Sequence, residues 1–250
     1  VVMADESDSW EIRDYAWAPD SKWIAYTLPQ SQTVNRIYIY SLSSGKSVPV
    51  TDLWYNSGQP TFDTNGKYLF FTSDRDFNPI YSRTEWNHAY HDMSGIYFVT
   101  LEKSTPSPFE PENDEVAVKK EAASDKKDKK DDKDKKDDTS AKEDGVTVNI
   151  DFDGIINRII ALPVKAANYW SITAIDNSVY YIEYKSGGDG AVMKLFDLKS
   201  KKDTELGQVG SYIVSADNKK MFVNMKGKYA VIDLPKGKVK PTEFLDLSNM

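Results

Sequence analysis

One alternating pattern of apolar and polar residues recurs along the chain. Residues 17–27 read WAPDSKWIAYT and residues 62–72 read FDTNGKYLFFT, so the two stretches align without a gap. The pattern returns in VSADNKKMFVN at residues 214–224 and, in shortened form, in TAIDNSVYYIE at residues 173–183. In each copy a pair of small polar residues, of the kind that favours tight turns, separates two apolar stretches. Each copy therefore predicts two antiparallel strands joined by a tight turn.

Most of these units add two further strands. Residues 35–52, 191–207 and 228–244 each read as a strand, a turn and a second strand. A repeat of about 42–45 residues with four antiparallel strands is typical of a β-propeller blade. The predicted fold class is therefore all-β, a β-propeller with about four blades. Because complete rings usually have about four to eight blades, we expect the chain to belong to a larger ring of six or seven.

The second unit is interrupted twice. Residues 73–94 form a long connection before the next predicted strand, GIYFVTL at residues 95–101. The segment 110–144 then contains 14 acidic residues, 10 lysines and only two bulky apolar side chains, both valine. Such a segment cannot bury enough apolar surface to offset the entropy lost on ordering it. We therefore predict a disordered surface loop in this segment.

The pattern of alternation resumes after this insertion. Residues 146–152 alternate and residues 159–164 are an apolar run, and both predict strands that complete the interrupted blade. The expected organisation places blades one and two in residues 1–109 and a disordered insertion in residues 110–144. The completion of blade two, with blades three and four, is expected in residues 145–250.

The strand period of two also predicts which side chains are buried. Alternate residues of each hairpin should face a neighbouring blade, and a slip of one residue would turn every apolar side chain toward solvent. Asp20 and Asn65 should lie at exposed turns. The positions predicted to be buried are Trp17, Ile24 and Tyr26 in the first copy, and Phe62, Leu69 and Phe71 in the second.

Composition narrows the range of functions. The net charge of −7 argues against broad binding to nucleic acid, and no run of 18 or more apolar residues predicts a membrane span. The absence of cysteine excludes disulfides, zinc thiolate sites and cysteine nucleophiles. The first ten residues do not resemble a signal peptide, and Met3 follows two valines, so we expect an excerpt of a longer protein.

No catalytic, cofactor or metal site is predicted. The chain lacks a Gly-x-Ser-x-Gly turn, a P-loop and a dinucleotide-binding fingerprint. Its only histidines, His88 and His91, are three residues apart and could chelate zinc beside Glu85 and Asp92, but a third strong ligand is missing. The sequence DFDG at residues 151–154 lacks the spaced carboxylates of a calcium loop and predicts an Asp-Gly turn.

One charged cluster is a candidate substrate-binding site. Asp74, Arg75 and Asp76 directly follow an inner strand, near one mouth of the predicted ring, where they could hold the terminus of a peptide. The alternative, which the sequence favours, is an internal salt-bridged turn. Trp54 and Tyr55, in the link between the first two blades, are interpreted as packing between blades.

Three stretches resemble the propeller region of tricorn-type serine peptidases. They are TSDRDFNPIYS (72–82), GIYFVTLEKSTPSPF (95–109) and NIDFDGIINRIIALPVKAANY (149–169), of which the third is the most specific. In that family, blades similar to those of TolB and the dipeptidyl peptidases precede helical, PDZ and catalytic domains. The lysine- and aspartate-rich insertion is a departure from the family pattern.

The resemblance implies a function in handling substrate. It implies partners in the form of peptides or unfolded polypeptide segments, and of PDZ and peptidase domains C-terminal to this chain. It also implies a cytoplasmic location, with a periplasmic one as the alternative, and possible homo-oligomerisation of the parent enzyme. The family's nucleophile and base lie beyond residue 250, so no catalytic residue is carried over. The alternative function is that of a TolB-like binding or scaffold propeller without an attached peptidase.

Overall fold

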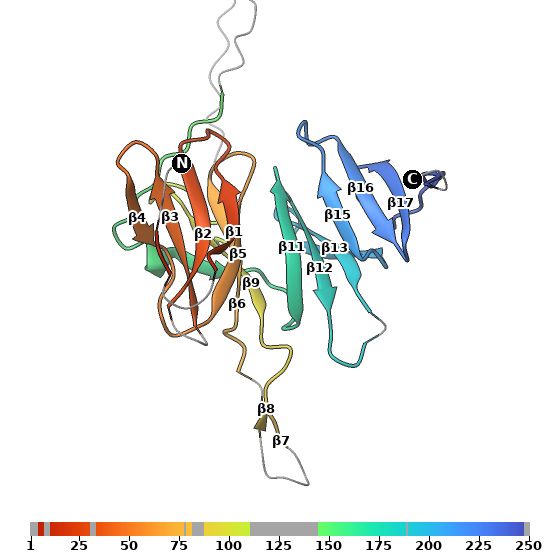
Figure 1. Ribbon diagram of the computed structural model, residues 1–250, viewed down its shortest axis with the longest axis horizontal. Coiled ribbons are helices and arrows are strands. Elements are labelled where there is room, and N and C mark those ends of the chain that lie inside the picture. Colours follow the sequence, from red (N-terminus) through yellow and green to blue (C-terminus); the bar gives the residue numbers. More distant parts are fainter. Residues whose placement is uncertain are drawn as a thin grey trace, which may run out of the picture.

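A computed structural model describes residues 5–7, 11–30, 34–77, 79–81, 88–110, 145–188 and 190–247. Within these ranges the strands form three four-stranded sheets, one three-stranded sheet and one small two-stranded hairpin. The sheets stand next to one another in chain order, as the blades of a propeller do (Figure 1). The all-β prediction and the prediction of a partial β-propeller are confirmed.

Blade 1 is a continuous meander. Its strands are β1 (Arg13–Trp17), β2 (Trp23–Pro29), β3 (Asn35–Ser41) and β4 (Lys46–Pro49), and each pairs antiparallel with the next. The turn between β3 and β4 contains Gly45 at a φ of 65°, a conformation that glycine adopts without steric cost. The predicted strand, turn and strand in residues 35–52 are therefore confirmed.

Blade 2 is assembled from two separate parts of the chain. Its strands are β5 (Ser57–Phe62), β6 (Tyr68–Ser73), β9 (Gly95–Thr100) and β10 (Ile159–Ala161), in the spatial order β10-β9-β6-β5. β10 follows the insertion and pairs antiparallel with β9, so this strand of the blade comes from beyond the insertion. Of the insertion itself, residues 111–144 lie outside the described part of the chain.

The prediction of a strand in residues 146–152 is wrong. This segment forms no strand in the structure, and hydrogen bonds join it to side chains of blade 1. The Nε1 of Trp23 donates to the carbonyl oxygen of Val148 at 3.2 Å, and the Val148 amide donates to Asp20 at 3.1 Å. The apolar alternation is real, because Val148 is buried in the core between blades 1 and 2.

One arginine makes several of the hydrogen bonds that attach the returning chain to blade 2. After Asp153 and Gly154, a 3-10 turn (Ile155–Arg158) leads directly into β10. The Arg158 guanidinium donates to the carbonyl oxygens of Thr100 and Asp153, at 3.1 and 3.0 Å, and to those of Leu101 and Asp151. Gly154 has a φ of 68°, so the structure places a turn at DFDG, as the sequence indicated.

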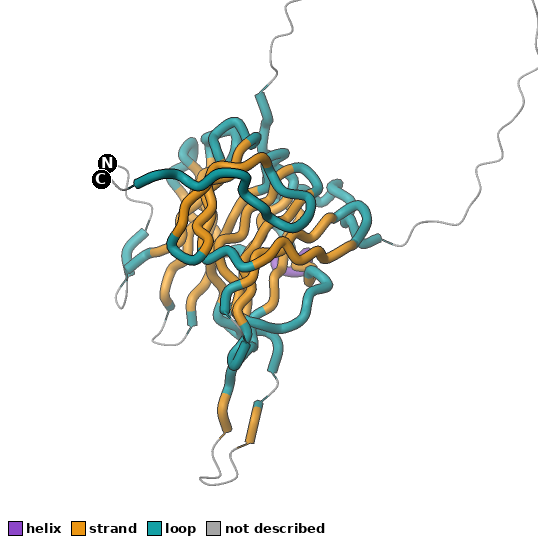
Figure 2. Tube along the Cα trace, turned by 90° about the vertical axis from the view of Figure 1, so that its right-hand side faces the viewer, coloured by secondary structure: helices purple, strands orange, loops and turns teal. Residues whose placement is uncertain are grey.

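A hairpin arm leaves blade 2 between β6 and β9. It contains β7 (Ile80–Tyr81) and β8 (His88–Ala89), which pair with each other and not with any blade. The arm projects well beyond the ends of the blade strands, at the bottom of Figures 1 and 2. The long connection predicted in residues 73–94 is therefore this arm together with its two stems.

Blade 3 is again continuous. Its strands are β11 (Asn168–Ile175), β12 (Ser178–Tyr184), β13 (Val192–Asp197) and β14 (Lys202–Gly207), in that spatial order. The predicted strand, turn and strand in residues 191–207 are confirmed.

Blade 4 has three strands in the described residues. They are β15 (Ser211–Val214), β16 (Lys220–Met225) and β17 (Lys228–Asp233). The second strand predicted within residues 228–244 is absent from this part of the chain. Val239 donates instead to the carbonyl oxygen of Leu206, a single backbone bond that ties the segment after β17 to blade 3.

Each interface between neighbouring blades has its own apolar core. Successive residues of a strand point to opposite faces, so the central strands are buried on both sides. Phe71 of β6 packs toward blade 1 and Phe70 packs toward blade 3, and both are fully buried. A third core joins blades 3 and 4 around Tyr180 and Met221. The blades are therefore held together mainly by apolar side chains that meet between sheets.

Most of the predicted burial pattern is confirmed. Tyr26, Phe62, Leu69 and Phe71 are buried, and Ile24 is partly buried. The prediction that Trp17 is buried is wrong, because the residue is 54% exposed. It lies opposite Ile24 on the face of blade 1 that points away from blade 2, where the described part of the chain places no further blade.

The two turn residues behave differently. Asn65 is exposed, as predicted. The Asp20 side chain is only 3% exposed, so the prediction of an exposed turn residue is wrong there. Its carboxylate accepts the amides of Lys22 and Val148, because the chain that follows the insertion crosses over this turn.

Candidate functional site

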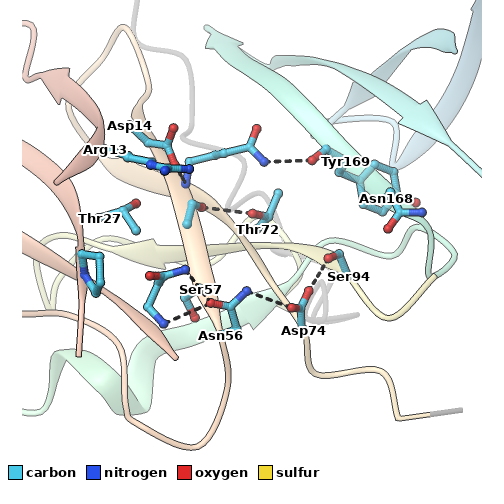
Figure 3. Close-up of a pocket in the computed structure, with 14 residues that line it drawn as sticks. Arg13, Asp14, Thr27, Asn56, Ser57, Thr72, Asp74, Ser94, Asn168 and Tyr169 are labelled. Carbon is cyan, nitrogen blue, oxygen red and sulfur yellow. Dashed lines mark hydrogen bonds between the residues drawn. The ribbon is translucent and has the colours of Figure 1, made fainter. Parts of the chain in front are cut away.

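A polar pocket of about 510 Å³ opens where the first three blades meet. It lies at one end of the inner strands β1, β5 and β11, next to the base of the hairpin arm, and Figure 3 shows its lining side chains. Small polar residues predominate over apolar ones. The lining residues are Arg13, Asp14, Thr27, Pro29, Asn35, Asn56, Ser57, Gly58, Gln59, Thr72, Asp74, Ser94, Asn168 and Tyr169.

The inner strands of the first three blades share one backbone irregularity. Each strand contains a β-bulge, and in each bulge a residue other than glycine adopts a left-handed conformation. These residues are Asp14, Gln59 and Ser171, with φ of 52°, 54° and 54°. Asp14 and Gln59 each stand three residues before their copy of the repeated sequence pattern, and Ser171 stands two residues before its shortened copy. Bulges redirect side chains and occur preferentially near functional sites.

Each bulge residue is hydrogen-bonded to the next blade. The Gln59 amide donates to Oδ2 of Asp14 at 3.3 Å, and the Gln59 side chain donates to the carbonyl oxygen of Tyr169 at 2.9 Å. The Tyr212 hydroxyl, in blade 4, donates to the carbonyl oxygen of Ser171. The bulges therefore link the four inner strands in succession, and they fix Asp14 and Gln59 at the pocket wall.

A second chain of hydrogen bonds forms the opposite wall. The backbone amide and side chain of Asn35 donate to Oδ1 of Asn56 at 3.0 and 2.9 Å. Asn56 donates in turn to Oδ2 of Asp74 at 3.0 Å, and the Ser94 hydroxyl donates to Oδ1 of the same carboxylate. Figure 3 shows this chain along the lower edge of the pocket. Asp74 is thus held in place from both of its oxygens.

The three predicted site residues separate in the structure. Only Asp74 lines the pocket. The Arg75 guanidinium lies over the rings of Tyr55 and Tyr97, at 4.9 and 5.2 Å from their centroids, and is 3.6 Å from Asp52. Asp76 is exposed and attached to the other stem of the arm by its backbone amide. Arg75 thus takes part in an internal salt-bridged turn, and Tyr55 packs against its guanidinium.

Thr27 is the most unusual residue of the pocket. Its side chain is buried, with 4% of the residue exposed, and it points into the pocket in Figure 3. Its hydroxyl has no hydrogen-bond partner among the described residues. A buried hydroxyl without a partner is unfavourable, so a donor supplied by a ligand would relieve this cost.

The aromatic member of the lining is fixed in its protonated form. Burial, with a further contribution from Glu183, raises the pKa of the Tyr169 hydroxyl above its usual range. This hydroxyl donates to the carbonyl oxygen of Lys165, just before β11. Tyr169 therefore contributes structure and shape to the pocket and does not titrate near neutral pH.

Neither of the weaker metal candidates gains support. His91 contacts Asp92 at 3.4 Å, while the side chain of His88 lies outside the described residues, as does Glu85. The described residues contain no group of three histidine, cysteine, aspartate or glutamate side chains close enough to hold a metal. Asp92 instead accepts hydrogen bonds from Ser186, whose amide is the main cause of its lowered pKa.

The fold and the pocket define the class of protein: an arc of a β-propeller whose inner strands border a polar hollow. In the part of the chain that the structure describes, no helix is long and apolar enough to cross a bilayer. The chain belongs to the family described as the second β-propeller domain of tricorn protease, whose family model matches residues 1–235.

Relatives of known sequence carry the same family name. The chain is 26% identical over 246 residues to tricorn protease homolog 1 of Streptomyces coelicolor, covering 93% of this chain and 22% of the relative. It is 26% identical over 247 residues to the tricorn protease of Thermoplasma volcanium, covering 91% of this chain and 21% of the relative. The chain thus spans about a fifth of the length of these curated relatives.

Solved structures agree on the fold. A crystal structure of the tricorn protease superimposes with a TM-score of 0.70 at 20% identity, covering 92% of this chain and 22% of that one. TolB from Acinetobacter baumannii superimposes with a TM-score of 0.51 at 17% identity, covering 95% of this chain and 44% of that one. The resemblance to tricorn-type propellers inferred from the sequence is confirmed.

Proposed function

We propose that this chain is a non-catalytic propeller segment of a tricorn-like serine peptidase, and that it guides peptides to a protease domain C-terminal to it. The observation that carries the proposal is the family match over residues 1–235, together with relatives that are named as proteases. The polar pocket beside the inner strands supplies a surface on which a peptide backbone can form hydrogen bonds.

The outer face of blade 4 supports a larger ring. Ile213, Phe222 and Val231 lie opposite one another on three neighbouring strands and form one apolar row. Ile213 is 69% exposed and Val231 is 55% exposed. The three other blade interfaces bury such rows, so we propose that a further blade packs here, in a ring of six or seven blades.

Further partners follow from the same proposal. They are peptides or unfolded segments, and PDZ and peptidase domains of the same protein, within a possible homo-oligomer in the cytoplasm. The competing proposal is a TolB-like scaffold propeller, for which the TolB superposition supports the fold alone. Sequencing the coding region that follows Met250 separates the two, since only the first requires a PDZ and a serine peptidase domain there.

The guiding role is tested by narrowing the pocket in the whole parent protein. Gly58→Trp places a large ring among the lining residues, at a backbone position that does not require glycine. We expect kcat/KM for long peptides to fall several-fold more than kcat/KM for a short chromogenic substrate. Gly237→Trp is the matched control, because a side chain there meets no atom within 4 Å. An equal effect on both substrates would contradict guidance by this propeller.

The non-catalytic role is tested on the isolated chain. We expect no peptide hydrolysis at any pH, because the sequence offers neither a nucleophile turn nor a base to activate one. Turnover that survives purification and disappears in His88→Ala or His91→Ala would overturn this proposal.

A further inference from the structure

Gly58 leaves a small space between two hydrogen-bond acceptors of the pocket. A Cβ atom at this position would lie 3.6 Å from Oδ2 of Asp14 and 3.7 Å from Oγ1 of Thr27. These are ordinary contact distances, and the φ of Gly58 lies outside the left-handed region, so the backbone alone does not demand glycine. The missing side chain therefore leaves unfilled a space that borders both oxygens.

Oδ2 of Asp14 and Oγ1 of Thr27 can each accept a hydrogen bond from a ligand. Asp14 is fixed by its bulge and by the Gln59 amide, yet the residue remains exposed. The Thr27 hydroxyl is buried and has no partner among the described residues. A carboxylate and an unpartnered hydroxyl around one cavity are the groups that bind an ammonium ion, which carries three donors.

The net charge of the pocket lining is negative, which also favours a cationic ligand. Asp14 and Asp74 are acidic and Arg13 is basic, so the charged lining residues sum to −1. No ion pair within 4.0 Å joins Arg13 to either aspartate in the described structure, and Arg13 is exposed. Asp74 is oriented by Asn56 and Ser94 and extends the negative potential across the pocket.

We propose that this pocket binds a primary ammonium group of a peptide between Oδ2 of Asp14 and Oγ1 of Thr27. The inference rests on the proposed function and specifies which part of the peptide is recognised. The group comes either from the α-amino terminus of the peptide or from a lysine side chain, and both present the same three donors.

The test is an NMR or calorimetric titration of the chain with three probes. They are trialanine amide, its N-acetylated form, and the N-acetylated amide of Ala-Lys-Ala. Trialanine amide is expected to bind, and acetylation should weaken binding by about tenfold or more, because it removes a charge-assisted hydrogen bond. Binding of the lysine probe would assign the site to side chains as well as to amino termini.

Three variants locate the site. Asp14→Asn retains the acceptor for Gln59 and tolerates the left-handed backbone, and it should weaken trialanine amide by about tenfold. Thr27→Val and Gly58→Ala should each weaken binding several-fold, the first by removing the hydroxyl and the second by filling the space. Asp76→Asn is the matched control, since it makes the same charge change outside the lining, and its affinity should stay within about twofold.

Two results would overturn the assignment. If acetylated and free trialanine amide bind equally and Gly58→Ala weakens both, the pocket binds peptides without reading the ammonium group, and guidance of peptides stands. If Asp14→Asn and Asp76→Asn weaken binding equally, the effect is that of overall charge. Failure of guidance itself would appear separately, as equal loss of long and short substrates in the Gly58→Trp parent.

Discussion

Blades 2 and 3 fill the same position of the repeat with different chemistry. Phe71 on β6 and Tyr181 on β12 each lie on the second strand of their blade and face the preceding blade. Phe71 lies opposite Tyr97, with ring centroids 6.1 Å apart and ring planes 24° from parallel. Tyr181 lies opposite Lys194, and its hydroxyl donates to Asp203 at 2.6 Å.

The polar partners of Tyr181 all belong to blade 3. The Lys194 ammonium lies 3.0 Å from Glu183 and 3.3 Å from Asp203. Burial alone would lower the pKa of Lys194, but the hydrogen bond to Glu183 and the nearby charge of Asp203 outweigh it, so the pKa is raised. Burial and Asp203 raise the pKa of Tyr181. Both groups therefore stay protonated and donate, and the repeat tolerates buried polar groups there because each has a partner.

The largest expected effect on stability comes from truncating Phe71, the apolar residue at this position in blade 2. Phe71→Ala should lower the free energy of unfolding by about 3–5 kcal/mol, because it removes a fully buried ring and leaves a cavity between blades 1 and 2. Lys67→Ala, on the exposed turn that precedes the same strand, should cost well under about 1 kcal/mol. Urea denaturation measures both, and the reverse ranking would contradict the blade register.

The second-largest expected effect is the loss of the buried hydrogen bond of Tyr181 in blade 3. Tyr181→Phe keeps the ring and removes the donor to Asp203, so it should cost about 1.5–3 kcal/mol, the range for a hydrogen bond to a charged group. Tyr184→Phe, in the same strand but partly exposed, serves as control and should stay within about 0.5 kcal/mol. A neutral Tyr181→Phe would show that the polar network contributes little to the stability of blade 3.

A third effect concerns one buried acid of blade 2. Asp63 is 1% exposed; its Oδ1 accepts the amides of Lys67 and Tyr68, and its Oδ2 has no partner in the described structure. Burial raises the pKa of this carboxyl. The folded state therefore holds the proton more tightly, and the contribution to stability falls as pH rises from about 3.9, the unfolded value, through the raised folded value.

Asp63→Asn removes this titration. The midpoint of urea denaturation, measured from pH 4 to 7, should decline less with rising pH in the variant than in the wild type. Asp217→Asn, on an exposed turn of blade 4, is the control, and its urea midpoint should decline with rising pH as much as that of the wild type. Parallel profiles for wild type and Asp63→Asn would mean that the buried carboxyl does not titrate in this range.

The sequence was sufficient for the blade pattern because the strand period and the turn residues agree. Phe62 and Leu69 fall on buried positions for that reason, whereas Trp17 has the same pattern but faces a side that no described blade covers. The segment 146–152 alternates like a strand, yet the hydrogen bonds of Val148 go to the side chains of Asp20 and Trp23. Partners more than a hundred residues away are not visible in a local pattern.

The pocket was only partly predictable. Asp74 was found because it directly follows an inner strand, but Asn56 and Ser94 reach it only through the topology of blade 2. The bulges had one usable signal, which is that Asp14 and Gln59 precede the repeated pattern by the same number of residues. Nothing in these residue types alone requires a left-handed backbone, so the geometry that aims Asp14 into the pocket had to come from the structure.

The smallest expected effect tests whether the divided blade depends on its insertion. Replacing residues 112–143 with a short Gly/Ser linker leaves β9, β10 and Arg158 intact, together with the hydrogen bonds that join them. Loop-closure entropy changes by only about 0.6 kcal/mol for each doubling of loop length, so shortening should raise Tm by no more than about 4 °C. Differential scanning calorimetry measures this. A fall in Tm of several degrees would mean that the insertion stabilises the blade, and that blade 2 differs from blade 3 in more than its connection.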